Sequence, residues 1–339
     1  MNISVFGSGA WGTAIALLLH DNGHDVTLWS KFRDEIEKLR HDKENPFLKG
    51  IGIPEDIFMT SSMDDAVQGT EVAVIAVPSF AVRETVDALK GRIADKCVIV
   101  CMSKGIEKDT SSLFTSIVKD AFGDDVRVAA VSGPTHAEEV ARRIPTACVA
   151  ASEDLALAEW VQGLLMNEYF RVYTSVDVIG VELGAALKNI IALCAGICDG
   201  LGLGDNTIAM LMTRGIAEMA ELCVAMGGRK ETLAGLAGLG DLIVTCMSRH
   251  SRNRRAGVLI GKGLPVEDAM REVGAVVEGY YAAKAAYDLA GTMKVDMPIC
   301  IEAYRVLYES KSHSDAIRDL MSRGKKSENS SDAKSWVSN

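Results

Sequence analysis

Residues 2–19 read NISVFGSGAWGTAIALLL, a short apolar run, a glycine-rich turn and an apolar segment in immediate succession. Within this stretch, Gly7, Gly9 and Gly12 have the G-x-G-x-x-G spacing of a dinucleotide-binding turn. The first glycine allows a tight turn, the second lets the backbone approach a pyrophosphate, and the third lets helix and strand pack closely. The helix that follows would offer free N–H groups to the phosphates. Glycines also occur in ordinary strand–helix turns, but the place of this one in a first βαβ unit favours dinucleotide binding.

Outward from this stretch, the first half of the chain alternates short β-branched runs with segments of helical periodicity. Apolar runs without alternation are typical of strands buried on both faces of a parallel sheet. The pattern predicts an α/β fold with a doubly wound Rossmann domain. The predicted strands are NISVFG, HDVTLW, EVAVIAVP, CVIVCMS, VRVAAVSG, TACVAA and FRVYTS, and the predicted helices cover 10–22, 80–91, 111–121 and 136–143.

From about Val176 strand-like runs become scarce and helical periodicity dominates. We therefore predict a dinucleotide-binding domain over 1–175, an all-helical substrate and catalytic domain over 176–320, and a polar, disordered tail over 321–339. A ligand site would lie in the cleft between the two domains. The predicted helices of the second domain cover 178–199, 206–226, 266–272, 281–289 and 299–309.

The composition restricts the class of protein. Of the 339 residues, 48% are hydrophobic and 24% are charged, which is typical of a soluble globular chain. The formal net charge of −10 disfavours nucleic acid and anionic membranes as partners, so an anionic substrate would require a local cluster of cations. We find no signal peptide and no run long enough to span a membrane. The eight scattered cysteines include no CxxC pair, which favours reduced thiols in a cytoplasmic protein. Of the six histidines, only His20 and His24 lie four residues apart, with Gly23 between them, so no metal site is predicted.

A lysine stands in an unusual place in the second domain. The segment 181–200, VELGAALKNIIALCAGICDG, is a helix pattern of small and apolar residues with Lys188 in its middle. No acid lies three or four residues away, so no local ion pair accounts for it. A desolvated lysine has a depressed pKa and can accept a proton near neutrality. The alternative is an amine that reaches water along the helix edge, and these residues alone leave both interpretations open.

The segment 235–257, GLAGLGDLIVTCMSRHSRNRRAG, combines one acid with a basic cluster. Asp241 ends the glycine-rich part, where it could also serve as an ordinary N-cap. Four arginines follow within seven residues, with no acid before Glu267, as phosphate recognition would require. A solvated charged face is the alternative. The four arginines are Arg249, Arg252, Arg254 and Arg255.

Three loops after predicted strands add candidate residues. After HDVTLW come Ser30 and Lys31 with no adjacent acid, which favours NADP or tolerance of both cofactors, unless Lys31 is merely solvated. Thr135 and Glu138 in SGPTHAEEV have capping-box spacing, which predicts a helix start at the carboxyl edge of the sheet. Lys104 in MSKGIEKDT lies at the same edge, where it could also be a surface lysine.

Taken together, these stretches resemble the bacterial-type NAD(P)-dependent glycerol-3-phosphate dehydrogenases. The matching stretches span about residues 1–310 in the family's order: GSGAWGTA, SKGIE, SGPTHAEEVAR, GAALKNIIALCAGICDGLGLGDN, GLGDLIVTCMSRHSRNRRAG and VVEGYYAA. The resemblance implies reversible hydride transfer between sn-glycerol 3-phosphate and dihydroxyacetone phosphate, for phospholipid synthesis. It also implies NADP or NAD as cofactor, and relatives suggest a homodimer.

The resemblance also implies roles for single residues. Lys188 would exchange the proton of the substrate's C2 hydroxyl, and Asp241 could orient it. The implied substrate-binding residues are Lys104, Gly133, Thr135, Lys188, Asp241, Ser251, Arg252 and Asn253. The implied cofactor-binding residues are Gly7, Gly9, Ala10, Trp11, Gly12, Lys31, Lys104, Ala137, Arg252, Asn253, Val276 and Glu278. Ala10 departs from relatives, which often carry Ser there, and Lys31 lies in a variable loop.

Two other classes stay open. A β-hydroxyacid or phosphogluconate-type dehydrogenase would share the Rossmann domain, the helical domain and the Lys188–Asn189 pair, but would recognise a carboxylate. A non-catalytic NADP-sensing module would explain the glycine turn and give no reason for Lys188 or Asp241.

Overall fold

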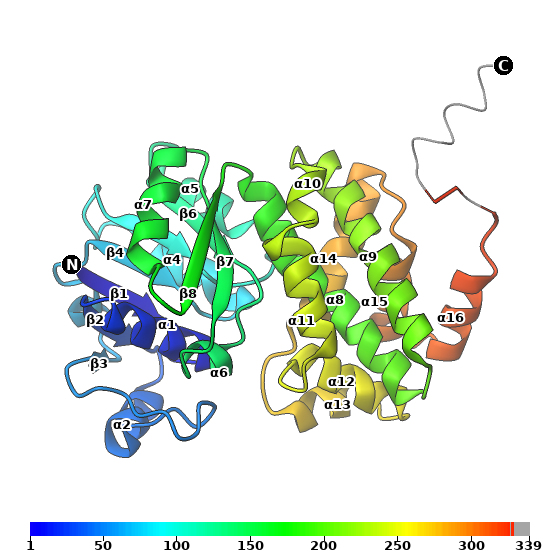
Figure 1. Cartoon of the computed structure of the whole chain (residues 1–339), viewed down its shortest axis with the longest axis horizontal. Coiled ribbons are helices and arrows are strands. Elements are labelled where there is room, and N and C mark those ends of the chain that lie inside the picture. The colour runs from blue at the N-terminus through cyan, green and yellow to red at the C-terminus, as the bar shows by residue number, and fades with distance from the viewer. Residues whose placement is uncertain (326, 329–339) are drawn as a thin grey trace.

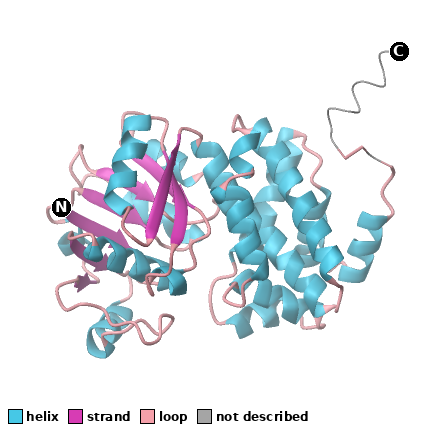
Figure 2. Cartoon of the chain, viewed as in Figure 1, coloured by secondary structure: helices cyan, strands magenta, loops and turns pink. Residues whose placement is uncertain are grey.

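A computed structural model describes residues 1–325, 327 and 328 of the chain. Two lobes lie side by side, one containing a sheet covered by helices and the other containing helices (Figure 1). Figure 2 shows the strands gathered in the first lobe. The predicted fold class, a Rossmann domain followed by a helical domain, is confirmed.

The first lobe is built on one eight-stranded sheet with the order β3-β2-β1-β4-β5-β6-β7-β8. All neighbouring strands are parallel except β6 and β7, which pair antiparallel. The order reverses between β1 and β4, so the carboxyl ends of these strands border the crevice where doubly wound folds bind their ligands. The strands are β1 (Asn2–Phe6), β2 (Asp25–Trp29), β3 (Phe58–Thr60), β4 (Val72–Ile75), β5 (Val98–Cys101), β6 (Val128–Ser132), β7 (Thr146–Ala151) and β8 (Phe170–Ser175).

The sheet is buried on both faces, and β5 shows how. Val98 and Val100 join one apolar cluster, whereas Ile99 and Cys101 join the cluster on the opposite face. Side chains alternate across a strand, so a run in which every residue is apolar must be covered on both sides. The covering segments are α1 (Ala10–Asp21), α2 (Arg33–Asp42), α3 (Met63–Val67), the 3₁₀ turn η1 (Ser79–Ala81), α4 (Val82–Leu89), α5 (Phe114–Phe122), α6 (Ala137–Val140) and α7 (Leu155–Leu165).

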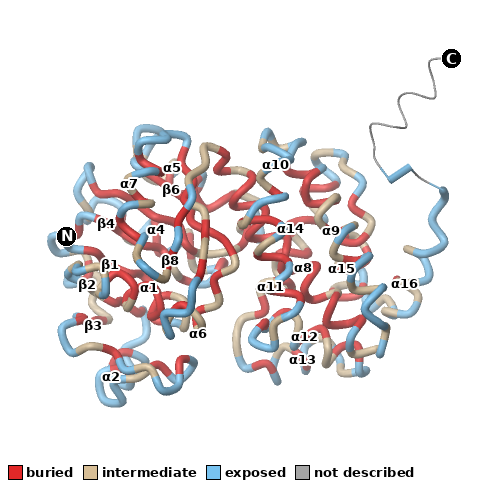
Figure 3. Tube along the Cα trace, in the orientation of Figure 1, coloured by how far each residue is buried: buried red, intermediate tan, exposed pale blue. Residues whose placement is uncertain are grey.

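The second lobe is assembled around α8 (Val178–Gly200), which is buried along most of its length (Figure 3). By length and composition α8 could cross a membrane, but 89% of its most apolar 18-residue stretch is buried inside the protein, as in a core helix. The surrounding segments are α9 (Asp205–Ala225), α10 (Lys230–Leu233), the π-helical turn η2 (Leu236–Gly240), α11 (Asp241–Met247), α12 (Arg252–Gly261), α13 (Val266–Val273), α14 (Glu278–Met293), α15 (Pro298–Tyr308) and α16 (His313–Met321).

Glycines let α12 lie against α8 at backbone contact. A Cβ on Gly257 would stand 2.1 Å from the Leu193 carbonyl oxygen, and one on Gly196 would stand 2.1 Å from that of Arg254. Side chains cannot separate the two helices there, so the start of α12 is held at a fixed place beside α8. The small residues of 181–200 thus position the Arg-rich segment relative to Lys188.

Several elements differ from the sequence prediction. Strand β3 and helices α2, α3 and α7 were not predicted in the first lobe, nor were α10, α11, α12 and α16 in the second. The tail predicted at 321–339 begins on the last residue of α16, and 326 and 329–339 lie outside the described residues. The eight cysteines are free thiols, and all but Cys194 are buried.

Candidate active site

The glycine turn has the geometry that a dinucleotide requires. Gly7 has φ +121°, and a Cβ there would lie 2.7 Å from the Ala76 carbonyl oxygen. A Cβ on Gly12 would collide with the Gly7 carbonyl oxygen, whereas one on Gly9 would have no described atom within 4 Å. Gly7 and Gly12 therefore make the turn and its packing, and Gly9 leaves open backbone at the N-terminus of α1. This surface fits a pyrophosphate.

Three charged side chains from both lobes meet at the centre of the candidate site. Lys188 on α8 donates to Asp241 Oδ1 on α11, and Lys104, in the loop after β5, donates to Asp241 Oδ2 at 2.9 Å. Lys188 Nζ also donates to Thr245 Oγ1 at 2.9 Å. Lys188 is only 5% exposed and Asp241 only 1%. The amine of Lys188 therefore does not reach bulk water, which excludes the solvated alternative for that residue.

Burial and the neighbouring charges shift both groups of the ion pair. Desolvation lowers the pKa of Lys188 to about 7; the charge of Lys104 reinforces this shift, while Asp241 opposes it. Burial opposes ionisation of Asp241, but the ammonium groups of Lys104 and Lys188 outweigh it and hold the Asp241 pKa below its usual range. Lys188 can therefore exchange a proton near neutral pH beside a carboxylate that stays charged.

Lys104 ties this cluster to the loop after β6. Its amine donates to the Gly133 carbonyl at 2.8 Å and to Thr135 Oγ1 at 3.1 Å. A Cβ on Gly133 would lie 2.7 Å from the Cα of Cys148, so this position requires glycine. The predicted capping box is wrong: Thr135 makes no cap, and the N-cap of α6 is His136, without a side-chain cap. The Thr135 hydroxyl instead accepts a hydrogen bond from Lys104 of the charged cluster.

Asp241 is likewise not an N-cap. It is the first residue of α11, which follows the Gly240 cap, and its carboxylate points to the two lysines. The N-cap role belongs to Ser251, whose hydroxyl accepts from the Arg254 N–H at 3.2 Å and starts α12. At this start Arg252 is exposed. Burial raises the pKa of the nearby Glu278, and the hydrogen bonds from Ser79 and the charge of Arg252 partly oppose this shift.

Asn253 is buried and connects three helices. Its Nδ2 donates to Asn189 Oδ1 on α8 at 2.9 Å, and its Oδ1 accepts from the Gly279 N–H on α14 at 2.8 Å. On α14, Glu278 accepts from the backbone N–H and the hydroxyl of Ser79, at 3.1 and 2.5 Å. The Glu278–Ser79 contact thus joins the helical lobe to the sheet lobe directly after β4.

The remaining candidate residues line the sheet side or lie farther out. Trp11 donates to the Met102 carbonyl at 3.0 Å, and Lys104 lies 5.9 Å from its ring centre. Ala10 and Ala137 begin α1 and α6, and Val276 is a half-buried residue just before α14. Lys31, by contrast, donates at 2.5 Å to Glu84, and the structure shows it in an exposed ion pair instead of in the charged cluster.

An acid does reach the end of β2, although sequence proximity did not indicate one. Glu35, in the first turn of α2, accepts from Ser30 Oγ at 2.7 Å and from Ser8 Oγ at 2.9 Å. It therefore stands between the glycine turn and the end of β2, the region where an acid usually selects NAD. Because Glu35 reaches this position, the lack of an acid next to Ser30 in the sequence does not by itself favour NADP over NAD.

Other polar residues of the site could not be predicted from local sequence, with one exception. Thr245 was detectable in principle, because it lies four residues after Asp241 and so shares its helix face. Ser79 and Glu35 act across 199 and 27 residues of sequence, which local spacing does not reveal. His136 lies beside the cluster: burial lowers its pKa, and the charges of Lys188 and Lys104 lower it further.

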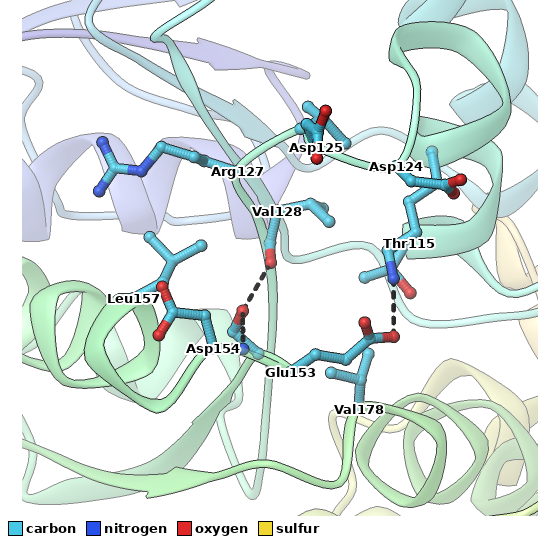
Figure 4. Close-up of a pocket in the computed structure, with 12 residues that line it drawn as sticks. Thr115, Asp124, Asp125, Arg127, Val128, Glu153, Asp154, Leu157 and Val178 are labelled. Atoms are coloured by element: carbon cyan, nitrogen blue, oxygen red, sulfur yellow. Dashed lines mark hydrogen bonds and ion pairs between the residues drawn. The ribbon is translucent and has the colours of Figure 1, made fainter.

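A separate cavity of about 210 Å³ lies where β6 begins, opposite the Gly133 end of that strand (Figure 4). Four acids surround it, namely Asp124, Asp125, Glu153 and Asp154. Its two cations are engaged, because Lys119 donates to Glu153 at 2.7 Å and Arg127 lies over the Trp160 ring. This cavity does not suit an anionic substrate.

A glycine turn for a dinucleotide and a buried lysine with a near-neutral pKa, placed where two lobes meet, define a dinucleotide-dependent dehydrogenase. Sequence models for the N- and C-terminal parts of NAD-dependent glycerol-3-phosphate dehydrogenase match residues 2–158 and 177–318. The chain belongs to the NAD(P)-dependent glycerol-3-phosphate dehydrogenase family. Membership in this family favours the predicted glycerol-3-phosphate dehydrogenase over the two alternatives, a hydroxyacid dehydrogenase and a non-catalytic sensing module.

Similar proteins support the same assignment across the whole chain. The glycerol-3-phosphate dehydrogenase [NAD(P)+] of a Thermoanaerobacter species is 51% identical over 97% of this chain and 99% of its own length. The protein of the same name from Fusobacterium nucleatum is 49% identical over 97% of this chain and 98% of its own. The crystal structure of glycerol-3-phosphate dehydrogenase from Coxiella burnetii, 37% identical, has a TM-score of 0.92 and covers 95% of this chain and 99% of that one.

Proposed function

We propose that this chain reversibly interconverts sn-glycerol 3-phosphate and dihydroxyacetone phosphate with NAD(P), and that the reaction supplies glycerol 3-phosphate for phospholipid synthesis. The buried Lys188–Asp241–Lys104 cluster carries the proposal, because it places a near-neutral amine between the dinucleotide-binding lobe and the Arg-rich start of α12. Family membership supplies the substrate pair.

Proton transfer is the task of Lys188. During oxidation the neutral amine accepts the proton of the C2 hydroxyl, and during reduction the ammonium donates it to the developing alkoxide. Asp241 positions the amine and stabilises the ammonium form, while Thr245 fixes its direction. Because Lys104 shares the carboxylate, Asp241 does not raise the Lys188 pKa to that of a simple ion pair.

Binding of the two reactants is divided between the lobes. Ser251, Arg252 and Asn253 would hold the phosphate of the substrate, with Gly133 and Thr135 on the opposite side; this anchoring converts distant binding into correct orientation. A dinucleotide bound at the glycine turn would supply the hydride chemistry. Its binding groups would be Gly7, Gly9, Ala10, Trp11, Gly12, Lys31, Lys104, Ala137, Arg252, Asn253, Val276 and Glu278.

One assay tests this function directly. Purified protein is mixed with dihydroxyacetone phosphate and either NADH or NADPH, and oxidation of the cofactor is followed. We expect turnover with both cofactors, and a Lys31→Glu variant should impair NADPH use more than NADH use. Turnover of a small hydroxyacid, with glycerol 3-phosphate inactive, would refute the proposed substrate.

The site of action and the assembly are also part of the proposal. The reduced state of the cysteines supports a cytoplasmic enzyme. A homodimer is supported by exposed apolar side chains on neighbouring helices of the second lobe: Ile243 and Met247 on α11, and Met210 on α9. Light scattering of the purified chain at several concentrations would measure the assembly.

A further inference from the structure

His136 is a polar residue of the site for which the mechanism above gives no role. It lies between Thr135 and Ala137 in the loop after β6, and the residue as a whole is half-buried. Its Nε2 atom is covered and has no hydrogen-bond partner among the described residues. Buried polar atoms in folded proteins are nearly always paired, so an unpaired one at the edge of a ligand site indicates a group that the ligand completes.

The positive charges around His136 are those that an anion-binding site requires. Lys104 and Lys188 lie close enough for both charges to lower its pKa, in addition to the larger effect of burial. Glu138 and Asp241 act in the opposite direction, and Asp241 is already shared by the two lysines. The imidazole is thereby kept neutral, with one ring N–H available as a donor.

The ring that lies against His136 from the helical lobe identifies the part of the substrate concerned. The His136 ring centre lies 6.2 Å from that of His250, which directly precedes Ser251 and Arg252. His136 therefore lies beside the segment that would hold the phosphate. The reacting hydroxyl, by comparison, belongs with Lys188.

We propose that His136 is a substrate-specificity residue whose Nε2–H donates a hydrogen bond to the phosphate group of the substrate from the sheet lobe. This inference rests on the proposed function and adds a phosphate contact to it. Because the contact is made to a non-reacting part of the substrate, its loss raises KM far more than it lowers kcat.

Two substitutions of matched polarity test the contact. Gln places an amide N–H near the position of the histidine Nε2, whereas Asn is too short to reach it. We expect His136→Asn to raise about ten-fold both the KM for dihydroxyacetone phosphate and the inhibition constant of inorganic phosphate, as loss of one hydrogen bond to an anion does. His136→Gln should stay within about three-fold of the wild type, and the KM for NADPH should be unchanged in both.

The controls separate the possible failures. His313→Asn, on α16, reports any general effect of replacing a histidine, and thermal melting confirms that each variant is folded. Wild-type turnover with dihydroxyacetone phosphate tests the proposed function by itself. If the wild type turns over this substrate, any of three results would overturn the assignment of His136. These are an equal KM for dihydroxyacetone phosphate in the Asn and Gln variants, an unchanged inhibition constant for inorganic phosphate in the Asn variant, or a shift in the KM for NADPH instead.

Discussion

Helix α8 carries one buried acidic and one buried basic side chain, Glu182 and Lys188, less than two turns apart. Burial favours the uncharged form of both side chains. It raises the pKa of Glu182 to about 7 and lowers the pKa of Lys188 to about 7. Their partners differ. Glu182 accepts from the backbone N–H and the hydroxyl of Thr115 at the start of α5, whereas Lys188 bonds to a carboxylate that a second lysine shares.

The difference shows that a shifted pKa does not by itself mark a catalyst. Each Glu182 oxygen accepts a hydrogen bond from Thr115, and one of these bonds pairs a backbone N–H that is otherwise free at the start of α5. Glu182 therefore joins the two lobes as a structural contact. Lys188 belongs to a charged cluster that reaches the sheet edge through Lys104, Gly133 and Thr135. The role of each residue is decided by what its polar atoms contact and where that contact lies in the fold.

The largest effect is expected from removing the amine. Lys188→Met keeps the length of the side chain and should lower kcat about 10²–10⁴-fold, the usual contribution of a general acid–base group. Lys104 continues to neutralise Asp241 in this variant, so we expect it to fold and to bind NADPH normally. The matched variant is Glu182→Gln on the same helix, which should retain its turnover. A Lys188→Met enzyme of undiminished kcat would erase the distinction between the two sites.

The sequence anticipated Lys188 because of its context. A lysine among Gly184, Ala185, Ile191 and Ala192 has no local partner, and such a pattern indicates either burial or a helix edge. Glu182 lies on the same helix and was not singled out, because its donors come from Thr115, 67 residues earlier. Contacts of that length depend on packing between the lobes, which local periodicity does not encode.

Contacts between distant segments also create some of the helices and strands that local sequence does not predict. Strand β3 has only three residues, Phe58–Thr60, and it is a strand because it pairs with β2 at the sheet edge. Helix α11 contains the β-branched run Ile243–Thr245, and α12 contains Asn253, Gly257 and Gly261, all of which have low helix propensity. Gly257 and Gly196 become favourable there because the backbones of α8 and α12 touch, and this gain is absent in an isolated helix.

The pH dependence of the two reaction directions should separate Lys188 from Glu182. The neutral amine is needed for oxidation, so kcat/KM for glycerol 3-phosphate should rise about ten-fold per pH unit below about 7 and level off above it. The ammonium is needed for reduction, so that direction should decline above about 7. Initial rates of both directions from pH 5.5 to 9 measure this. If Glu182→Gln displaced the inflection, Glu182 would belong to the catalytic machinery.

A smaller effect, on stability, is expected from the other site. Glu182→Ala leaves the buried N–H and hydroxyl of Thr115 without their acceptor, which should lower the free energy of unfolding by about 1–3 kcal/mol. Denaturant titration measures this change, and kcat should stay close to the wild-type value. A large fall in kcat with unchanged stability would reverse the roles assigned to the two residues.

The smallest effect concerns how stability depends on pH. The pKa of Glu182 is raised in the folded state from 4.5 to about 7, so between these values the folded chain binds more protons at this site than the unfolded chain. Its contribution to stability is therefore complete below about 4.5 and is lost as the pH rises through 7.

Glu182→Gln removes this titration, so the decline in stability between pH 5 and 8 should become shallower, by at most about 1.4 kcal/mol per pH unit, the limit for one proton. Glu309→Gln, at an exposed site, should leave the decline unchanged. The buried Glu218, whose pKa burial also raises to about 7, continues to titrate in both variants and preserves part of the slope. A Glu182→Gln slope equal to that of the wild type would show that the carboxylate remains ionised in its contact with Thr115.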